Sequence, residues 1–171
     1  YNIYMNITFN TQDLINKIKN IAPTAEAKQT LAILGNLKVE INAGKAVFTA
    51  SDLEIEVSTS MVCTSDQDGS FTIPAKKMLE ICNALSTHNE IKISVTDTKA
   101  DLTAGKSKVS LQIIPAADYP KMKKKNKIYM NITFNTQDLI NKNKNIAPTA
   151  EAKQTLAILG NMKVEISAGK A

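Results

Sequence analysis

A near-perfect internal repeat constrains this chain more than any other feature. Residues 1–46 return as residues 126–171, and the two copies differ at five positions. The differing pairs are Tyr1 and Asn126, Asn2 and Lys127, Ile18 and Asn143, Leu37 and Met162, and Asn42 and Ser167. Solenoid repeats diverge and occur in threes or more, because each unit stacks on its neighbours. Two near-identical copies therefore indicate a recent duplication or an assembly error.

The repeat also sets the domain boundaries that the sequence predicts. We expect residues 5–120 to form one domain and residues 121–129 to be a lysine-rich linker. Residues 130–171 are expected to be a truncated duplicate of residues 5–46, which makes an incomplete half-domain copy. A chain of 171 residues suits one ordinary domain but is short for two.

The second copy is expected to fold poorly. Asn143 stands where Ile18 completes an apolar stripe, and burying its amide without partners would cost about 1–3 kcal/mol. We therefore expect residues 126–171 to be partly disordered, or to compete poorly with residues 1–46 for the same place. Met5 is expected to be the natural start of the protein.

Composition and local sequence predict a cytoplasmic protein. The chain is 43% hydrophobic and 22% charged, as soluble globular proteins are. Its apolar runs are too short for a membrane span, and its first residues lack the features of a secretory signal. Cys63 and Cys82 form no Cys-x-x-Cys pair, which indicates two small apolar residues and neither a metal site nor a disulfide framework.

The net charge of +5 is unevenly distributed along the chain. Residues 1–120 hold 11 Lys and 13 Asp or Glu, net −2, whereas residues 121–171 hold 10 Lys and 3 acids, net +7. Total basicity is therefore a poor argument for nucleic-acid binding. All 21 basic residues are lysine, so no arginine is present to read guanine or phosphate with two bonds. Any contact with DNA is expected to be non-specific and salt-sensitive.

Two helices are predicted. Asn10 or Thr11 can cap a helix that runs to about residue 22, and Pro23 stands just beyond its end. Pro74 precedes a second helix over about residues 75–85. Each helix has one apolar stripe at helical spacing, formed by Leu14, Ile15, Ile18, Ile21 and Ala22 in the first and by Met78, Leu79, Cys82 and Leu85 in the second.

Short β-type runs surround these helices. The expected segments are residues 5–10, several runs within residues 31–61 with a turn at 43–45, a turn at 66–69, and strands at 91–95, 100–103 and 108–114. The order is strand, helix and several strands, and then the same again. This order predicts an α+β fold with two helices packed on antiparallel sheet.

Candidate catalytic groups are few. His88, the only histidine, is expected to be a solvated loop residue, and the glycines are isolated turn residues that form no phosphate loop. Asp52, Glu54 and Glu56 alternate along an expected strand, which would put the three acids on one face. A polar strand face explains this row better than a metal cluster. We expect no enzyme and no cofactor.

Four ordered motifs resemble the bacterial DNA sliding clamp, the beta subunit of DNA polymerase III. The motifs are Thr-Leu-Ala-Ile-Leu-Gly-Asn at 30–36, Ser-Asp-Leu-Glu at 51–54, Ile-Pro-Ala-Lys-Lys at 73–77 with Ile81 and Cys82, and Pro-Ala-Ala-Asp-Tyr-Pro at 115–120. Each is weak alone, but the set in register covers residues 5–120. Ala32 departs from the proline that is common in the family.

This resemblance implies the DNA clamp (processivity) fold, one domain of two β-α-β-β-β halves whose helices face the hole of a ring. It implies a protein that encircles double-stranded DNA, slides without reading sequence and tethers DNA polymerase III. Lys28 would occupy a DNA-contacting position, and Lys76 would be a second basic position near the hole. The family's other partners are clamp subunits and the clamp loader, whose docking groove lies in later domains.

The resemblance also implies a subunit interface along residues 106–111. Val109 and Leu111 would be its apolar contacts, and Lys77, Lys106 and Lys108 would face acids of a partner subunit. The simpler alternative is an edge strand that lysines protect against aggregation.

Two other functions stay open at this point. The first is a stand-alone, truncated clamp-like domain that binds DNA weakly or inhibits full-length clamp. The second, from another class, is a metal-dependent enzyme that uses Asp52, Glu54 and Glu56.

Overall fold

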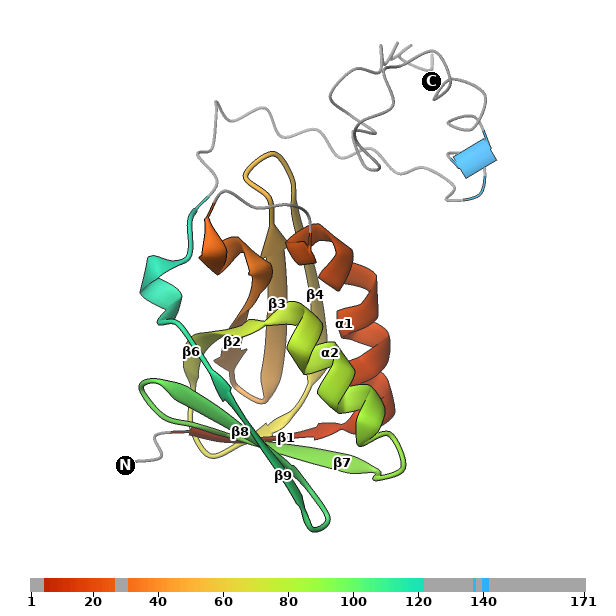
Figure 1. The fold of residues 1–171 in the computed structure, drawn as a ribbon, viewed down its shortest axis with the longest axis vertical. Helices are drawn as coiled ribbons and strands as arrows, with labels where there is room; N and C mark the ends of the chain where they lie inside the picture. Colours follow the sequence, from red (N-terminus) through yellow and green to blue (C-terminus); the bar gives the residue numbers. More distant parts are fainter. Residues whose placement is uncertain (1–4, 27–30, 122–136, 138–139, 142–171) are drawn as a thin grey trace, which may run out of the picture. The chain divides into compact units, whose positions relative to one another are not determined.

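The computed structural model describes residues 5–26, 31–121, 137 and 140–141, and the fold below concerns the first two of these ranges (Figure 1). The chain divides into two units after Lys124. Lys28 and nearly all of the second copy lie outside the described residues. The predictions for the linker and for residues 126–171 therefore stay predictions.

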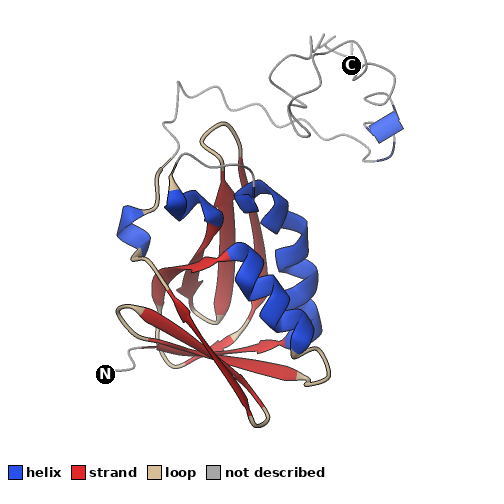
Figure 2. Cartoon of the chain, viewed as in Figure 1, coloured by secondary structure: helices blue, strands red, loops and turns tan. Residues whose placement is uncertain are grey.

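Two antiparallel sheets form the first unit (Figure 2). The five-stranded sheet has the order β5-β1-β7-β8-β9, with β1 at Met5–Asn10, β5 at Thr64–Ser65, β7 at Glu90–Val95, β8 at Lys99–Ala104 and β9 at Ser107–Gln112. The four-stranded sheet has the order β4-β3-β2-β6, with β2 at Asn36–Asn42, β3 at Lys45–Ser51, β4 at Glu56–Val62 and β6 at Gly69–Pro74.

Two α-helices lie side by side over the four-stranded sheet (Figures 1 and 2). They are α1, Thr11–Glu26, and α2, Ala75–Ala84, and two short 3₁₀ helices, η1 at Ala32–Gly35 and η2 at Ala116–Asp118, complete the unit. The chain order is β1-α1-β2-β3-β4 and then β6-α2-β7-β8-β9, with the two-residue β5 between the halves. This confirms the predicted α+β fold of two β-α-β-β-β halves. Within the described residues, no helix is long and apolar enough to cross a membrane.

The first helix begins where the sequence predicts but ends later. Asn10 caps it, because its Oδ1 accepts the backbone N–H of Asp13 at 3.0 Å. The predicted end before Pro23 is wrong, since α1 continues to Glu26 with Pro23 inside it. Thr24 and Ala25 are buried, so packing of this last turn outweighs the hydrogen bond that proline cannot donate.

The predicted turn after β2 is present, whereas two other segments depart from the prediction. Residues 43 and 44 join β2 and β3 with φ values of 46° and 76°, as a type I′ hairpin turn requires. The run expected to be β-type from Leu31 begins instead with η1. Strand β6 was missed, because glycine and proline stand at its two ends, yet it pairs with β2 along its whole length.

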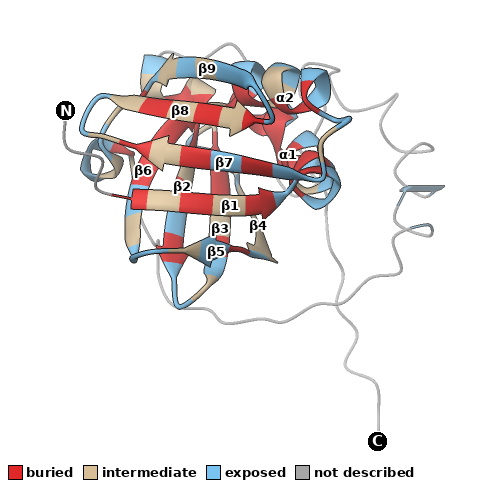
Figure 3. Cartoon of the chain, turned by 90° about the horizontal axis from the view of Figure 1, so that it is seen from below, coloured by how far each residue is buried: buried red, intermediate tan, exposed pale blue. Residues whose placement is uncertain are grey.

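The core lies between the helices and the two sheets. Strand residues alternate between core and surface, as Met5, Ile7 and Phe9 of β1 do (Figure 3). The rings of Phe9 and Phe48, one from each sheet, have centroids 5.7 Å apart. All of the predicted apolar stripe of α1 is buried, and so are Met78, Cys82 and Leu85 after it. The helices are thus held by their apolar faces and turn their polar faces to the surface.

Candidate nucleic-acid and subunit interfaces

The polar face of the helix layer is the first candidate surface. Its exposed side chains are mostly amides and lysines, contributed by Gln12, Asp13, Asn16, Lys19 and Asn20 of α1 and by Lys76, Lys77, Glu80 and Asn83 of α2. These residues stand opposite the buried stripes because both helices are amphipathic. The surface therefore combines hydrogen-bonding groups with a small positive charge.

Lys76 and Lys77 occupy the first turn of α2, which has no acidic residue there. The Nζ of Lys77 lies 3.1 Å from Oε2 of Glu80 one turn further on. Lys76 is exposed and forms no ion pair with the described residues. A cation in the first turn of a helix is disfavoured by the helix dipole. The positive charge of Lys76 therefore does not stabilise α2.

The second candidate surface is the outer edge of β9, the last strand of the five-stranded sheet (Figure 3). Lys106 and Lys108 are exposed, whereas Val109 and Leu111 are half-buried. Leu111 packs against the core. Of the predicted residues, Lys108, Val109 and Leu111 thus lie on β9, Lys106 lies in the turn that precedes it, and Lys77 lies on α2.

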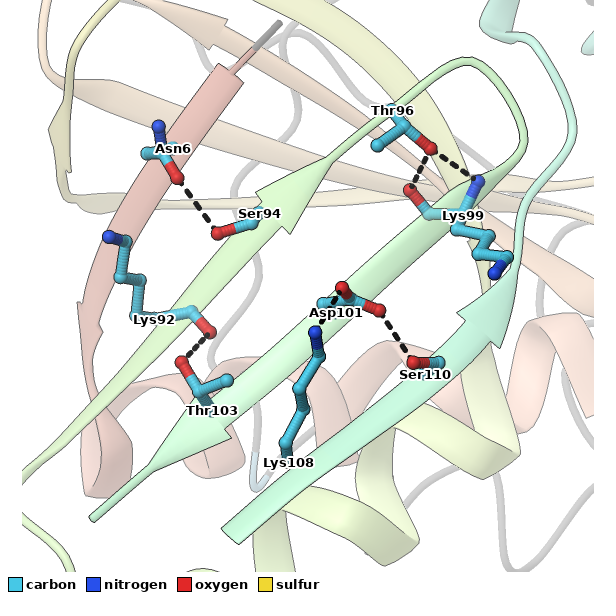
Figure 4. Close-up of polar contacts among 9 residues, drawn as sticks. All are labelled: Asn6, Lys92, Ser94, Thr96, Lys99, Asp101, Thr103, Lys108 and Ser110. Atoms are coloured by element: carbon cyan, nitrogen blue, oxygen red, sulfur yellow. Dashed lines mark hydrogen bonds and ion pairs between the residues drawn. The ribbon is translucent and has the colours of Figure 1, made fainter. Parts of the chain in front are cut away.

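Asp101 of β8 binds two polar side chains of β9 (Figure 4). Its Oδ1 accepts the hydroxyl of Ser110 at 2.6 Å, and its Oδ2 lies 2.9 Å from Nζ of Lys108. The Ser110 hydrogen bond and then Lys108 hold the pKa of Asp101 below its ordinary value. Sequence reasoning missed Asp101, although the β8–β9 hairpin register pairs it directly with Ser110.

His88 is half-buried rather than solvated. Its backbone N–H donates to the carbonyl of Leu85, and its ring lies against Gly105 in the β8–β9 turn. A Cβ at Gly105 would stand 2.6 Å from the ring, and the φ of +55° there also favours glycine. The histidine therefore helps to hold the hairpin in place.

The expected row of acids on one strand face is wrong. Strand β3 ends at Ser51 and β4 begins at Glu56, so Asp52 and Glu54 lie in the turn between them. The Oδ1 of Asp52 accepts the backbone N–H groups of Glu54 and Ile55 at 2.9 and 2.8 Å, which makes it a turn-capping residue. Among the described residues, no three His, Cys, Asp or Glu side chains are grouped as metal ligands.

Both cysteines are free thiols, and their burial agrees with the prediction of two small apolar residues. Burial raises the pKa of Cys82 to about 12, and burial and the nearby Asp68 raise the pKa of Cys63. The reactive thiolate form is therefore disfavoured at both positions.

Comparison with known proteins identifies the fold and its relatives. Residues 5–123 match the family described as the DNA polymerase III beta subunit, N-terminal domain. The chain is 29% identical to the beta sliding clamp of Haemophilus influenzae over 119 residues, which are 69% of this chain and 32% of that protein. It is 30% identical to the beta sliding clamp of Vibrio harveyi, covering 69% of this chain and 82% of that sequence.

Solved structures agree with these matches. The sliding clamp of Pseudomonas aeruginosa bound to griselimycin superposes with a TM-score of 0.67 at 29% identity, covering 73% of this chain and 34% of that one. The Bacillus subtilis clamp has a TM-score of 0.66 at 22% identity, which shows the shared fold. The chain spans about a third of the length of most of the curated relatives it matches.

Proposed function

The chain belongs to the family of the DNA polymerase III beta subunit, N-terminal domain, and from that premise we propose that it works as part of a DNA sliding clamp. In this proposal the clamp encircles duplex DNA and tethers DNA polymerase III. Its contribution is processivity and not catalysis. Its place would be the cytoplasm, and its further partners would be other clamp subunits and the clamp loader.

We propose that the polar face of α1 and α2 lies toward the DNA. The observation that carries this proposal is Lys76, an exposed cation that forms no ion pair with the described residues and lies in a helix turn where the dipole disfavours it. Lys28, which follows α1 by two residues in the sequence, would add a second phosphate contact. The two helices run in opposite directions, so the start of α2 and the end of α1 are at the same end of the layer (Figure 1).

The chemistry of this face suits a surface that slides. Amide side chains and a few lysines attract phosphates without strong local binding, and the absence of arginine removes the side chain that most often reads guanine. Phosphate contacts position a protein on DNA but carry no sequence information. We therefore expect weak, non-specific and salt-sensitive binding.

We further propose that the edge of β9 joins clamp subunits. Val109 and Leu111 would be the apolar contacts, and Lys77, Lys106 and Lys108 would supply the charges around them. Support comes from the position of β9 at the border of its sheet and from its half-buried apolar residues. Edge strands with such residues readily add a further strand.

The DNA proposal is tested by the salt dependence of binding to a short duplex, measured by fluorescence anisotropy on the full chain. Each lost phosphate contact lowers the steepness of log K against log salt by about 0.9. Lys28→Ala and Lys76→Ala are each expected to lower it by about that amount. Lys45→Ala, an exposed lysine at the start of β3, is the matched control and should leave the slope unchanged. Slopes for Lys28→Ala and Lys76→Ala equal to that of the wild type would contradict the proposal.

A further inference from the structure

We propose that residues 130–171 can take the place of residues 5–46 in the domain, on the body that residues 47–114 form. The two segments differ only at positions 18, 37 and 42 of the first copy. The chain thus holds two versions of one domain. In the first, the segment that forms β1, α1 and β2 precedes the body, and in the second its repeat follows the body. DNA binding and subunit contacts play no part in this exchange.

The described residues of the second copy have the same local structure as their counterparts in α1. Gln137, Ile140 and Asn141 are helical. The Nε2 of Gln137 donates to Oδ1 of Asn141 at 3.1 Å. The same side-chain bond joins Gln12 and Asn16 of α1 at 3.5 Å. The repeat therefore carries the helical signal of α1 as well as its sequence.

The apolar face of this helical segment is less buried than that of α1. Ile140 is 43% exposed, whereas Ile15, its counterpart in α1, is 7% exposed. In proteins, most of the stability of an amphipathic helix comes from packing of its apolar face. The surface that buries Ile15 of α1 is complementary to the repeat, because the two sequences are nearly the same. That surface is therefore the place where the second copy gains most from docking.

Polar contacts between the first copy and the body use residues that the second copy repeats. Asn6 forms side-chain hydrogen bonds with Asp66 and Ser94, each at 2.8 Å. The amide of Asn36 donates to the buried hydroxyl of Thr72 at 2.9 Å. Asparagine also stands at the equivalent positions 131 and 161. The pairing of β1 with β7 and of β2 with β6 uses backbone groups, so the second copy can form these ladders too.

Three differing positions decide which copy occupies the place. Position 42 is exposed, so its change from asparagine to serine is harmless. Leu37 is fully buried, and the methionine of the second copy is apolar and similar in volume. Ile18 is also fully buried, whereas Asn143 would bring an amide into the apolar stripe. The first copy is therefore preferred, and one residue accounts for most of that preference.

The connection between the body and the second copy is long enough for the exchange within one chain. The Sδ of Met5 lies 3.2 Å from the Cβ position of Gly69, and Thr72, further along β6, bonds Ile114 at 3.1 Å. At about 3.3 Å per strand residue, this path is on the order of 15–20 Å. The chain from Ile114 to Met130 can extend to about 50 Å once η2, whose backbone bonds are internal, is drawn into it.

The first test moves the critical isoleucine from one copy to the other in the full chain. Ile18→Asn leaves both copies with asparagine in the stripe, so protection of the body from hydrogen exchange should fall by about a hundredfold or more. Adding Asn143→Ile completes the stripe of the second copy and should restore most of the lost protection. The readout is amide exchange at Ile93 and Leu102, in β7 and β8, which belong to neither copy.

A matched control adds the same side chain to the same segment at a position that needs no burial. Ile18→Asn with Lys144→Ile places isoleucine at the counterpart of the exposed Lys19. This control should stay at the low protection of Ile18→Asn alone. Protection in the chain with Asn143→Ile that is no higher than in this control overturns the inference.

The second test identifies which copy pairs with β7. Thr8 of β1 lies opposite Lys92, and Thr133 is its repeat. Opposite residues have Cα atoms about 4.5–5.5 Å apart, within the range that a disulfide spans. Lys92→Cys with Thr133→Cys should cross-link when Ile18→Asn and Asn143→Ile are both present, and little without them. Lys92→Cys with Thr8→Cys should show the reverse.

The cross-link forms by thiol–disulfide exchange with oxidised glutathione, which takes up the two thiol hydrogens and leaves as two molecules of reduced glutathione. Electrophoresis without reductant then separates a bond within one chain from a bond between two chains. A bond within one chain, between positions 92 and 133, is the expected result. A bond that forms only between chains, or equally well without Ile18→Asn and Asn143→Ile, overturns the inference. Neither readout involves DNA, so the proposed function stands or fails separately.

Discussion

The two halves of the domain share one order of elements but distribute their polar residues differently. The first half, residues 5–62, has five lysines and six acids, net −1, whereas the second half, residues 69–112, has six lysines and four acids, net +2. Helix α1 has 16 residues, a side-chain cap from Asn10 and Asp13 in its first turn. Helix α2 has 10 residues, no side-chain cap, and two lysines in the corresponding place.

This difference separates residues that stabilise the fold from residues that are available for contacts with partners. The first turn of α1 stabilises its helix, since the cap satisfies a free N–H and the acid complements the dipole. The features of α2 do the opposite, and its stability depends on the burial of Met78 and Cys82. Residues that oppose local stability are expected at sites of function. This difference supports the proposal that the main contacts with partners lie in the second half.

The largest expected effect is in the core of the first half. Ile18→Asn introduces at a fully buried position the residue that the second copy carries at Asn143. It should lower the free energy of unfolding by about 3–5 kcal/mol, since the site loses an aliphatic side chain and buries an amide. Urea denaturation measures this loss. Lys19→Asn, on the exposed side of the same helix, is the control and should change stability by less than about 0.5 kcal/mol.

A smaller loss is expected at the cap of α1. Asn10→Ala removes the acceptor for the N–H of Asp13 and should cost about 1 kcal/mol in the same experiment. Asn20→Ala, an exposed mid-helix position, should be neutral or slightly stabilising because alanine favours helix. Equal losses for the two variants would show that the cap does not stabilise α1.

A gain in stability, rather than a loss, is expected from a substitution at the start of α2. Lys76→Glu places an acid in the first turn and should raise the free energy of unfolding by about 0.3–1 kcal/mol, while it weakens duplex binding. Thermal unfolding and anisotropy measure the two effects on one sample. Lys45→Glu, outside any helix, should give no such gain. A variant that loses stability and keeps its affinity would contradict the division between the halves.

The smallest effects concern two carboxylates, Asp66 between the two halves and Asp101 in the second half. Asp66 accepts the backbone and side-chain N–H groups of Asn6, both at 2.8 Å, and these bonds lower its pKa. The pKa of Asp101 is lowered by Ser110 and Lys108. A lowered folded-state pKa contributes stability above the unfolded value, about 3.9, and that stability is lost as pH falls through the folded value. Both contributions are therefore present at neutral pH and are lost only in the acid range.

NMR titration can assign these shifts separately. Asn6→Ala should raise the pKa of Asp66 alone, and Ser110→Ala should raise the pKa of Asp101 alone. A carboxylate that titrates at its ordinary value in the wild type would contradict the hydrogen bonds described for it.

Much of this fold could be predicted from local sequence signals. The apolar stripes of both helices, the cap at Asn10 and the turn at 43–44 each follow from residue type and spacing. Long-range packing could not be predicted, and it explains the helix that continues past Pro23 and the pairing of β6 with β2. The prediction that Asp52, Glu54 and Glu56 share one strand face was wrong for a similar reason. Alternating residues are typical of a strand, but the carboxylate of Asp52 accepts two backbone N–H groups further along the chain and so forms a turn.

The candidate sites were predictable only in part. The motifs indicate the family, and the resemblance alone suffices to predict Lys106 and Lys108 as interface residues. The role of Asp101 needed the register of a hairpin, since Lys108 and Ser110 reach it from the adjacent strand. Local sequence patterns therefore predict candidate residues for a site, but the pairing of the strands determines which of these residues are in contact.

The most direct test of the central claim maps duplex DNA onto the ¹⁵N-labelled full chain by amide chemical-shift changes. The helix face predicts the largest changes at exposed positions of both helices, such as Asn16, Lys19, Lys76 and Asn83, and small changes on the polar face of β7 and β8. Changes confined to the lysine-rich residues 121–127, with the helix amides unmoved, would contradict the assignment of DNA binding to this domain.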